Sequence, residues 1–440
     1  MSVPPPPDTP SPARPDSSPA PGAITRAHCA ALDAADALAP LRDLYALPEG
    51  VVYLDGNSLG PPPRAALERV ARTVADEWGR GLIRSWNDAG WMDLPQRVGA
   101  AIAPLIGAHA DEVIVADSTS VNLYKLLGAA LRMRPDRRVV VSERANFPTD
   151  LYVAQGLLEQ AGTGYALRLV ERDEIAHALD ERTAAVMLTE VDYRSGARLD
   201  MAAITARAHG VGALTLWDLA HSAGAIEVDL AGAHADFAVG CGYKYLNGGP
   251  GAPAFAYAAR RHHEALRPPL TGWMGHATPF AFETGWAPAP GVGRLRVGSP
   301  PVLSMTALEC GVQAFAAAAP LGGMAALRRK SVALTDLFVT LVEARCAGHG
   351  LELVSPRDAR RRGSQVSWRL ADGDAAYAIV QALVRRGVVG DFRAPDVLRF
   401  GFAPSYLRHV DVWDAVEHLR EVLETREWKD PALARRLAVT

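Results

Sequence analysis

Two neighbouring stretches decide the fold of this chain: Leu216-Trp217-Asp218-Leu219-Ala220-His221-Ser222 and Val239-Gly240-Cys241-Gly242-Tyr243-Lys244-Tyr245-Leu246-Asn247-Gly248-Gly249-Pro250-Gly251. Each begins as a short apolar strand and ends in a turn that carries polar residues. In a sheet of parallel strands the carboxyl ends lie at one edge, where ligands bind. We therefore expect Asp218 and Lys244 to meet at that edge, where the following glycines let the backbone approach a ligand closely.

The segments around these stretches alternate between strand and helix. We predict strands over 112–116, 138–142, 184–190, 214–218, 237–241 and 252–258, and helices over 61–80, 123–132, 151–160 and 201–209. Short strands separated by helices form βαβ units. The pattern therefore predicts an α/β fold whose large domain has a mostly parallel central sheet flanked by helices.

The pattern changes after about residue 308. Strands are predicted over 365–370 and 397–401, and helices over 324–346, 375–386 and 410–424. This mixture is typical of a small α+β domain. We expect four parts in all: a disordered proline-rich tail (1–25), an N-terminal segment that joins the small domain and the active site (26–60), a large cofactor-binding domain (61–310) and a small C-terminal domain (311–440).

The composition excludes several classes of protein. With 49% hydrophobic and 22% charged residues, the 440-residue chain resembles a folded enzyme rather than a fibre or a disordered protein. Its net charge of −3 excludes a strongly basic nucleic-acid binder. The four cysteines are far apart and form no CxxC pair. We therefore expect no disulfide framework, no metal site and a reducing, cytoplasmic location.

Two segments bear on targeting and membranes. Residues 1–22 contain nine prolines and lack the basic start and apolar centre of a signal peptide. The most apolar stretch, 311–327, is interrupted by Pro320 and is too short to span a bilayer. We interpret it as a buried helix and turn, and we expect no membrane partner.

Lysine is rare in this sequence. Of 46 basic residues only four are lysine, namely Lys125, Lys244, Lys330 and Lys429. We interpret Lys125, Lys330 and Lys429 as solvated charges on helices or near the C-terminus. Lys244 differs because it follows a strand and stands in a glycine-dense turn between two tyrosines. An exposed loop lysine remains an alternative at this position.

Asp218 and His221 give Lys244 a chemical context. Pyridoxal phosphate needs a lysine for its Schiff base and a carboxylate that keeps its ring nitrogen protonated. Asp218 at a strand end suits the ring nitrogen, and His221 suits a position near the ring substituents. Asp218 as a helix cap and His221 as a core histidine remain alternatives.

A phosphate site and a ring-stacking site are also predicted. Ser118-Thr119-Ser120 precedes a helix, so hydroxyls and free backbone N–H groups converge at a positive helix end. Phe147-Pro148-Thr149-Asp150 follows another strand and offers an aromatic face and a second carboxylate. The alternatives are a simple helix cap for the serines and threonine and a core position for Phe147.

Five motifs together resemble the kynureninase family: Tyr53-Leu54-Asp55-Gly56-Asn57-Ser58-Leu59-Gly60, Ala145-Asn146-Phe147-Pro148-Thr149-Asp150, residues 217–222 and 243–251 of the two stretches quoted above, and Leu270-Thr271-Gly272-Trp273-Met274-Gly275-His276. The similarity covers roughly residues 27–425. It implies the fold of the aspartate-aminotransferase class, fold type I of the pyridoxal-phosphate enzymes. It also implies a homodimer with active sites at the subunit interface. The implied activity is hydrolysis of L-kynurenine to anthranilate and L-alanine in tryptophan degradation.

The resemblance also implies roles for single residues. Cofactor-binding roles fall on Thr119, Ser120, Phe147, Asp150, Asp218, His221, Tyr243, Lys244, Trp273 and Ser299, where some relatives carry Asn or Thr in place of the serine. Lys244, Tyr243 and Asp218 would also carry the catalysis. Arg399 matches the arginine that clamps the substrate carboxylate, a task that suits a bidentate guanidinium. Asn57 and Ser58 match a substrate-side loop, and Arg84 and Trp86 match the aryl pocket.

Two other functions remain open from the sequence. A cysteine desulfurase or selenocysteine lyase shares the Asp218 and Lys244 regions but needs a nucleophilic cysteine, for which Cys346 is the candidate. A non-catalytic pyridoxal-phosphate-binding protein is the second. The sequence leaves open the preference between L-kynurenine and its 3-hydroxy form.

Overall fold

A computed structural model of the chain describes residues 24–437. The predicted proline-rich tail therefore lies, up to residue 23, outside the described residues. The large domain is built on a seven-stranded sheet in the order β2-β8-β7-β6-β5-β3-β4, in which β8 runs antiparallel to both neighbours. The strands are β2 (Val113–Val115), β3 (Val139–Glu143), β4 (Ala166–Val170), β5 (Thr183–Thr189), β6 (Leu214–Asp218), β7 (Phe237–Gly240) and β8 (Phe255–Ala258).

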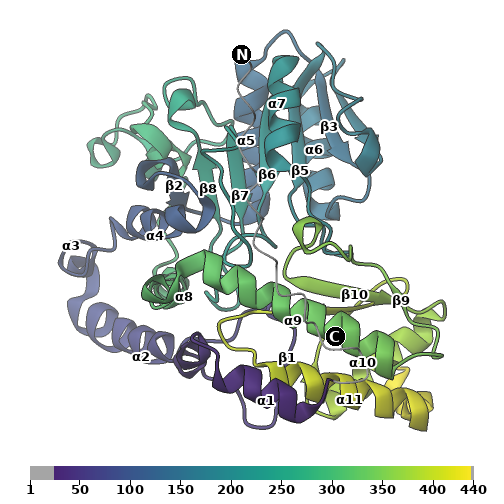
Figure 1. Cartoon of the computed structure of the whole chain (residues 1–440). Coiled ribbons are helices and arrows are strands. Elements are labelled where there is room, and N and C mark those ends of the chain that lie inside the picture. Colours follow the sequence, from purple (N-terminus) through teal and green to yellow (C-terminus); the bar gives the residue numbers. More distant parts are fainter. Residues whose placement is uncertain (1–23, 438–440) are drawn as a thin grey trace, which may run out of the picture.

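The central strands are buried on both faces, which explains their nearly continuous apolar sequences. On β6, Leu214 and Leu216 join a core shared with α5 and α6, while Trp217 points into the core of the opposite face. Helices cover both faces of the sheet (Figure 1). Those of the large domain are α2 (Arg64–Arg72), α3 (Ser85–Asp88), α4 (Leu94–Ile102), α5 (Thr119–Met133), α6 (Pro148–Ala161), α7 (Met201–Gly210) and α8 (Val302–Ala316).

The register of the sheet brings the predicted polar residues to one edge. Thr189 at the end of β5 pairs with Asp218 at the end of β6, and Asp218 pairs with Val239 of β7. The loop that carries Lys244 follows β7 directly. The mostly parallel sheet flanked by helices confirms the predicted fold class.

The small domain contains an antiparallel sheet in the order β12-β13-β10-β9. Its elements are α9 (Gly323–Arg345), β9 (Glu352–Leu353), β10 (Gln365–Arg369), α10 (Gly373–Arg385), β11 (Val388–Val389), β12 (Asp391–Arg393), β13 (Val397–Gly401) and α11 (His409–Thr425). The N-terminal segment lies on this domain (Figure 1): α1 (Arg26–Ala34) packs against α11, and β1 (Val52–Tyr53) pairs with β11. The predicted domain boundaries stay a prediction; residue 310 lies inside α8.

Helix α8 and the turn after it account for the apolar stretch. The segment Val302–Leu321 is long and apolar enough to cross a bilayer by length and composition, and half of its most apolar window is buried in the fold. Helix α8 packs against α2 and α4. The helix followed by a turn at Ala319–Leu321 agrees with the interpretation of this stretch as buried helix and turn.

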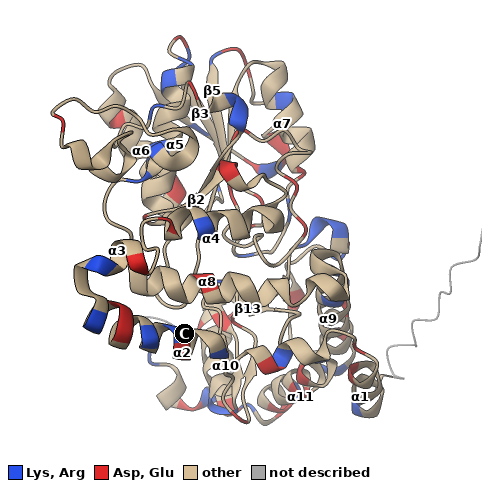
Figure 2. Ribbon diagram, turned by 90° about the vertical axis from the view of Figure 1, so that its left-hand side faces the viewer, with Lys and Arg blue, Asp and Glu red and all other residues tan. Residues whose placement is uncertain are grey.

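Charged residues of both signs alternate along the outer helices (Figure 2). On α11, for example, Arg420 forms ion pairs with Glu417 and Glu424. Such i,i+3 and i,i+4 pairs contribute only a few tenths of a kcal/mol each, about 0.2–0.5. The packed apolar cores rather than these surface pairs therefore hold the two domains in shape.

Candidate active site

Lys244 lies at the centre of the polar edge of the large sheet. Its Nζ is 3.0 Å from Nε2 of His221, 5.9 Å from the ring centroid of Phe147 and 6.0 Å from that of Tyr243. Within residues 24–437, no carboxylate lies within 4.0 Å of this amine. An amine with aromatic and imidazole neighbours and no ion-pair partner is free to react.

The other lysines correct one expectation. Lys125 is fully buried, where its Nζ donates to Oδ2 of Asp117 and to the carbonyl of Leu295, both at 2.6 Å. Lys330 is also buried, and its Nζ lies 2.7 Å from Oδ2 of Asp36. The interpretation of these two as solvated charges was wrong, because partners distant in sequence compensate the loss of hydration. Lys244 remains distinct from these two because none of the described residues offers it a carboxylate within 4.0 Å.

Asp218 and Asp150 form a buried acidic pair beside Lys244. Asp218 ends β6 and Asp150 lies in the first turn of α6, and both are almost completely buried. Burial raises the pKa of both carboxyls, and the charge of Asp218 raises the pKa of Asp150 further. Lys244 opposes both shifts. Two buried carboxyls that lack a full cationic partner suit a ligand that brings a protonated ring nitrogen.

Asp218 also serves as a local cap, so its alternative interpretation holds in part. Its Oδ1 accepts a hydrogen bond from the backbone N–H of Ala220 at 2.8 Å. On the other carboxylate, Oδ2 of Asp150 accepts a long hydrogen bond of 3.4 Å from the hydroxyl of Thr189. These contacts hold both carboxylates in place.

The start of α5 forms the predicted anion site. Ser118 is the cap, and its Oγ accepts from the backbone N–H of Val121 at 3.3 Å. Thr119 and Ser120 occupy the first turn, so their hydroxyls and N–H groups lie at the positive end of a 15-residue helix. The capping alternative is therefore correct for Ser118.

Tyr243 and Ser299 lie beside this helix end. Together with Ser118 and Arg296, they line a cavity of about 380 Å³. The neighbouring Cys241, burial and the charge of Asp218 raise the pKa of Tyr243. The phenol therefore stays protonated and can donate a hydrogen bond to an anion.

This donor set fits pyridoxal phosphate. Lys244 supplies an amine, Asp218 and Asp150 supply carboxylates for a ring nitrogen, and the start of α5 supplies donors for a phosphate. Phe147 is 38% exposed and offers a ring face close to Lys244. Among the described residues, no group of three or more His, Cys, Asp or Glu side chains could hold a metal ion.

Arg399 occupies the small-domain side of the site. Its guanidinium is 1% exposed and forms a bidentate pair with Asp391, in which Nε lies 2.8 Å from Oδ1. Nη2, which also bonds Asp391, donates to the hydroxyl of Ser58 at 2.7 Å, and Nη1 donates to the carbonyl of Tyr193 at 2.6 Å. With its side-chain amide turned over, Asn57 accepts from Nε at 3.0 Å. Nε and Nη2 of the guanidinium are therefore engaged by Asp391, Ser58 and Asn57, whereas Nη1 has only the carbonyl of Tyr193 as a partner among the described residues.

A second cation and a second acid surround this pair. Arg393 donates to Asp391 at 2.5 Å and to Ser58 at 3.1 Å. Burial, followed by the charge of Asp391, raises the pKa of Asp55 to about 7. The guanidinium of Arg399 holds the pKa of Asp391 below its ordinary value despite its burial. An incoming carboxylate thus meets two arginines and one firmly ionised aspartate.

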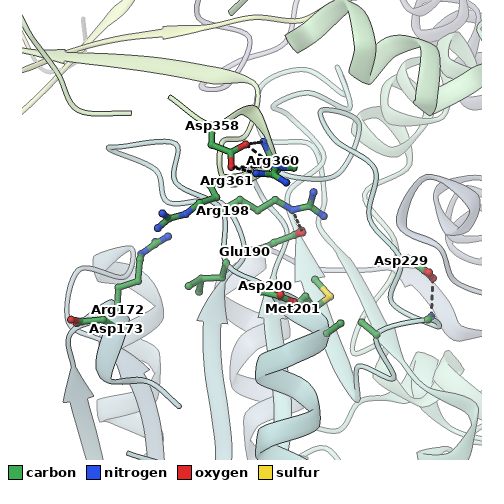
Figure 3. Close-up of a pocket in the computed structure, with 14 residues that line it drawn as sticks. Arg172, Asp173, Glu190, Arg198, Asp200, Met201, Asp229, Asp358, Arg360 and Arg361 are labelled. Carbon is green, nitrogen blue, oxygen red and sulfur yellow. Dashed lines mark hydrogen bonds and ion pairs between the residues drawn. The ribbon is translucent and has the colours of Figure 1, made fainter. Parts of the chain in front are cut away.

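A large cavity of about 1060 Å³ lies elsewhere, between the large domain and the loop 358–361 of the small domain. Figure 3 shows four arginines around it. They are Arg172, Arg198, Arg360 and Arg361. Three of the four are already paired, with Glu143, Glu190 and Asp358. None of the predicted site residues lines this cavity, so its size does not mark the reactive centre.

Comparison with known proteins agrees with this geometry. The family profile described as the kynureninase C-terminal domain matches residues 327–419. The chain is 55% identical to a kynureninase of Burkholderia mallei over 421 residues, which cover 94% of this chain and all of the relative. It is 53% identical to a kynureninase of Pseudomonas fluorescens over the same shares. The chain belongs to the kynureninase family.

Solved structures show the fold that the kynureninase family shares with other enzymes. A cysteine desulfurase from Thermococcus onnurineus superimposes with a TM-score of 0.73 at 18% identity, over 88% of this chain and 98% of its own. A cysteine desulfurase from Escherichia coli superimposes with a TM-score of 0.71 at 20% identity, over 88% of this chain and 98% of its own. These similarities concern the fold alone.

Cys346 is not placed as a desulfurase nucleophile in this kynureninase-family chain. It caps the C-terminal end of α9, is 3% exposed and belongs to the hydrophobic core. Burial raises the pKa of its thiol to about 12. A buried thiol of this pKa is not a ready nucleophile.

Three residues predicted for a kynureninase site lie apart from Lys244 in the single chain. Trp273 is 41% exposed and contacts Phe280 edge-on. Trp86 packs edge-on against Trp91, and Arg84 is exposed and donates only to backbone carbonyls of its own helical turn. No contact of the described chain joins them to the Lys244 cluster, so their roles stay proposals.

Several residues of the site were not predicted from the sequence. Thr189 could have been found at the end of its strand, since the neighbouring strand end holds Asp218. Asp55 lies inside a quoted motif and Asp391 lies eight residues before Arg399, but neither carries a signal of its own. Gln365 begins a strand of the small domain, and nothing in its local sequence points to the site.

Proposed function

We propose that this protein is a pyridoxal-phosphate-dependent kynureninase. It cleaves the Cβ–Cγ bond of L-kynurenine, and of 3-hydroxy-L-kynurenine, by hydrolysis to anthranilate or its 3-hydroxy form and L-alanine. The observation that carries the proposal is the unpaired amine of Lys244 between His221 and Phe147, next to two buried carboxyls. The identity of 53–55% to named kynureninases over nearly the whole chain supports it.

The proposed cofactor supplies the electron sink. Pyridoxal phosphate forms a Schiff base with an amine and withdraws electrons from the adjacent carbon through its protonated ring. Asp218, buried and ionisable, keeps a ring nitrogen protonated, with Asp150 as a second carboxylate. Thr119, Ser120 and Tyr243 donate hydrogen bonds to the phosphate.

The chain's own groups then handle the substrate and its protons. Arg399, through Nη1, and the hydroxyl of Ser58 hold the substrate carboxylate and so fix the orientation of the α-carbon, while Asp391 and Asn57 hold the guanidinium at Nε and Nη2. With the cofactor bound, Nζ of Lys244 would accept the α-proton of the substrate. Nε2 of His221 accepts a hydrogen bond from that same amine. Water then adds to the aryl ketone, and the carbon–carbon bond breaks.

We also propose that the protein works as a cytoplasmic homodimer. Two sets of exposed apolar side chains support a second copy: Trp78, Leu82 and Ile83 near α2, and Trp273, Phe280 and Phe282 in the loop 270–285. Large exposed apolar groups of this kind mark interaction surfaces. In the dimer, Trp273, Trp86 and Arg84 of one copy would complete the site of the other. The four cysteines are free thiols, as expected in a reducing compartment.

Parallel assays test this proposal. Purified protein loaded with pyridoxal phosphate is incubated with L-kynurenine and, separately, with L-cysteine. We expect fluorescent anthranilate from the first and no sulfide from the second. Cys346→Ala should leave anthranilate formation unchanged, while Lys244→Ala should abolish it. Sulfide production that depends on Cys346, without anthranilate, would replace the proposal by the desulfurase alternative.

A further inference from the structure

Gln365 connects the small domain to the reactive centre. It is the first residue of β10 and is fully buried. Its Oε1 lies 2.9 Å from Nδ1 of His221, across the domain interface. Its Nε2 donates to the carbonyls of Asp192 and Tyr193 at 2.9 and 3.1 Å. A small-domain side chain therefore contacts the histidine that contacts Lys244.

These contacts determine which way the amide of Gln365 points. An amide nitrogen only donates and an amide oxygen only accepts. Two carbonyl oxygens face one end, so that end is the nitrogen and the other is the oxygen. The oxygen can only accept, and Nδ1 of His221 must therefore carry the hydrogen.

The tautomer of His221 follows from this arrangement. A neutral imidazole has one protonated nitrogen and one with a lone pair, and the hydrogen bond at one selects the state of the other. With the hydrogen on Nδ1, the lone pair of Nε2 faces Nζ of Lys244 at 3.0 Å. Burial and the charges of Lys244, Arg399 and Arg393 hold the pKa of His221 well below its ordinary value, so the ring stays neutral.

We propose that Gln365 is a positioning residue that holds His221 in the Nδ1–H tautomer and thereby presents the Nε2 lone pair to the amine of Lys244. The inference rests on the proposed function, in which Lys244 takes the α-proton. An amine that donates one hydrogen to His221 keeps its own lone pair directed elsewhere, toward the substrate. If the hydrogen were on Nε2, His221 would instead donate a hydrogen bond to Nζ of Lys244 and occupy the lone pair that must accept the α-proton.

Packing shows that the position of Gln365 is built into the fold. A side-chain carbon on Gly196 would lie 2.8 Å from Cγ of Gln365, so the loop 191–198 presses directly on it. The same loop is also held by Ser367, which donates to the carbonyl of Arg194, and by Ser355, which donates to that of Ser195. Attachment of the loop is therefore shared among several residues, whereas the contact with His221 Nδ1 belongs to Gln365.

The test compares two variants of β10 in the loaded enzyme. Gln365→Met keeps the length of the side chain and removes its acceptor and donors. Ser367→Ala removes one loop contact without touching His221 and is the matched control. We expect Gln365→Met to lose about 10- to 1,000-fold in kcat, which is a part of the roughly 100- to 10,000-fold that a positioned acid–base group contributes. KM and cofactor content should stay close to wild type, and Ser367→Ala should keep kcat.

A direct readout accompanies the kinetics. In the enzyme labelled with ¹⁵N-histidine, the signals of His221 are assigned by their loss in His221→Gln, and their shifts report which nitrogen carries the hydrogen. We expect Nδ1–H in the wild type and in Ser367→Ala, and a mixture or Nε2–H in Gln365→Met. Gln365→Glu keeps an acceptor at Nδ1 and should retain the Nδ1–H tautomer.

Each contrary result has a defined meaning. An Nε2–H tautomer in the wild type overturns the inference, even if Gln365→Met fails to fold. So does a kcat of Gln365→Met within twofold of wild type, or an equal loss of kcat in Ser367→Ala. Absence of anthranilate from the wild type would instead refute the proposed function, while the tautomer would still decide the role of Gln365.

Discussion

Replacement of Arg399 by lysine tests how the site holds its substrate. The guanidinium bonds Asp391 through Nε and Nη2, donates to Ser58 from Nη2 as well, and donates to the carbonyl of Tyr193 from Nη1. A lysine keeps the positive charge but offers a single nitrogen on a flexible stem. It cannot remain on Asp391 and also present a flat pair of donors to a carboxylate.

The expected loss follows from these contacts. A hydrogen bond to a charged group contributes about 1.5–3 kcal/mol, and at least one such bond to the substrate carboxylate disappears. The buried charge that loses part of its pairing adds a further penalty, so the total loss in binding free energy is about 2–5 kcal/mol. At about 1.4 kcal/mol for each factor of ten, kcat/KM should fall roughly 30- to 4,000-fold.

The assay is steady-state anthranilate fluorescence, with the absorbance spectrum of bound pyridoxal phosphate recorded on the same sample. The spectrum should stay unchanged, because Arg399 serves the substrate rather than the cofactor. Arg369→Lys is the control. Arg369 lies on the neighbouring strand β10, pairs with Asp396 and has 48% of its side chain exposed. Such surface ion pairs contribute about 0–1 kcal/mol. A thermal unfolding scan of each variant excludes a loss caused by misfolding.

One result would refute this assignment. If Arg399→Lys turns over normally while Arg393→Ala does not, the carboxylate is held by Arg393. That arginine shares Asp391 and Ser58 with Arg399, so the structure allows the exchange. The clamp would then lie on β12 instead of β13.

Three further predictions concern the cofactor and stability. Borohydride reduction of the loaded enzyme followed by proteolysis should place the cofactor on the peptide of Lys244, and Lys244→Ala should lose the visible absorbance; a label on Lys125 or Lys330 would refute the assignment. Asp218→Ala should bind pyridoxal phosphate more weakly and lose several orders of magnitude in kcat, with a small part retained in Asp218→Glu; near-normal turnover of Asp218→Ala would move the role to Asp150. Because the pKa of Asp55 is raised to about 7 from an ordinary value of 3.8, the folded state holds a proton that the unfolded state releases between those values. The stability that the protonated Asp55 contributes is thus lost as the pH rises toward 7. The increase in the free energy of unfolding caused by Asp55→Asn should therefore be up to about 3 kcal/mol larger at pH 8 than at pH 5. The check is the melting temperature of both proteins at the two pH values, and an equal difference at both would contradict the raised pKa.

Much of the cofactor side of the site could be predicted because it is local in sequence. Asp218, Asp150 and Lys244 each follow a strand closely, and parallel strands bring their carboxyl ends to one edge. The start of α5 was predictable for a similar reason, since a polar cluster before a helix marks its positive end. The predicted strands were mostly found; β1, β4, β9, β11 and β12 were missed because they are short or lie at sheet edges.

What the amino-acid sequence determined by itself was the α/β fold, the family and the residues offered to the cofactor, because apolar periodicity and short motifs act over a few residues. Only the tertiary structure decided the partners of buried charged and polar groups. Lys125 meets Asp117 and Leu295, Asp391 fills one edge of Arg399, and Gln365 reaches His221 from the other domain. Hydrogen bonds and ion pairs depend on distances of about 3 Å. Packing within the large domain brings Leu295 to Lys125, the pairing of β12 with β13 brings Asp391 to Arg399, and the packing of the two domains brings Gln365 to His221.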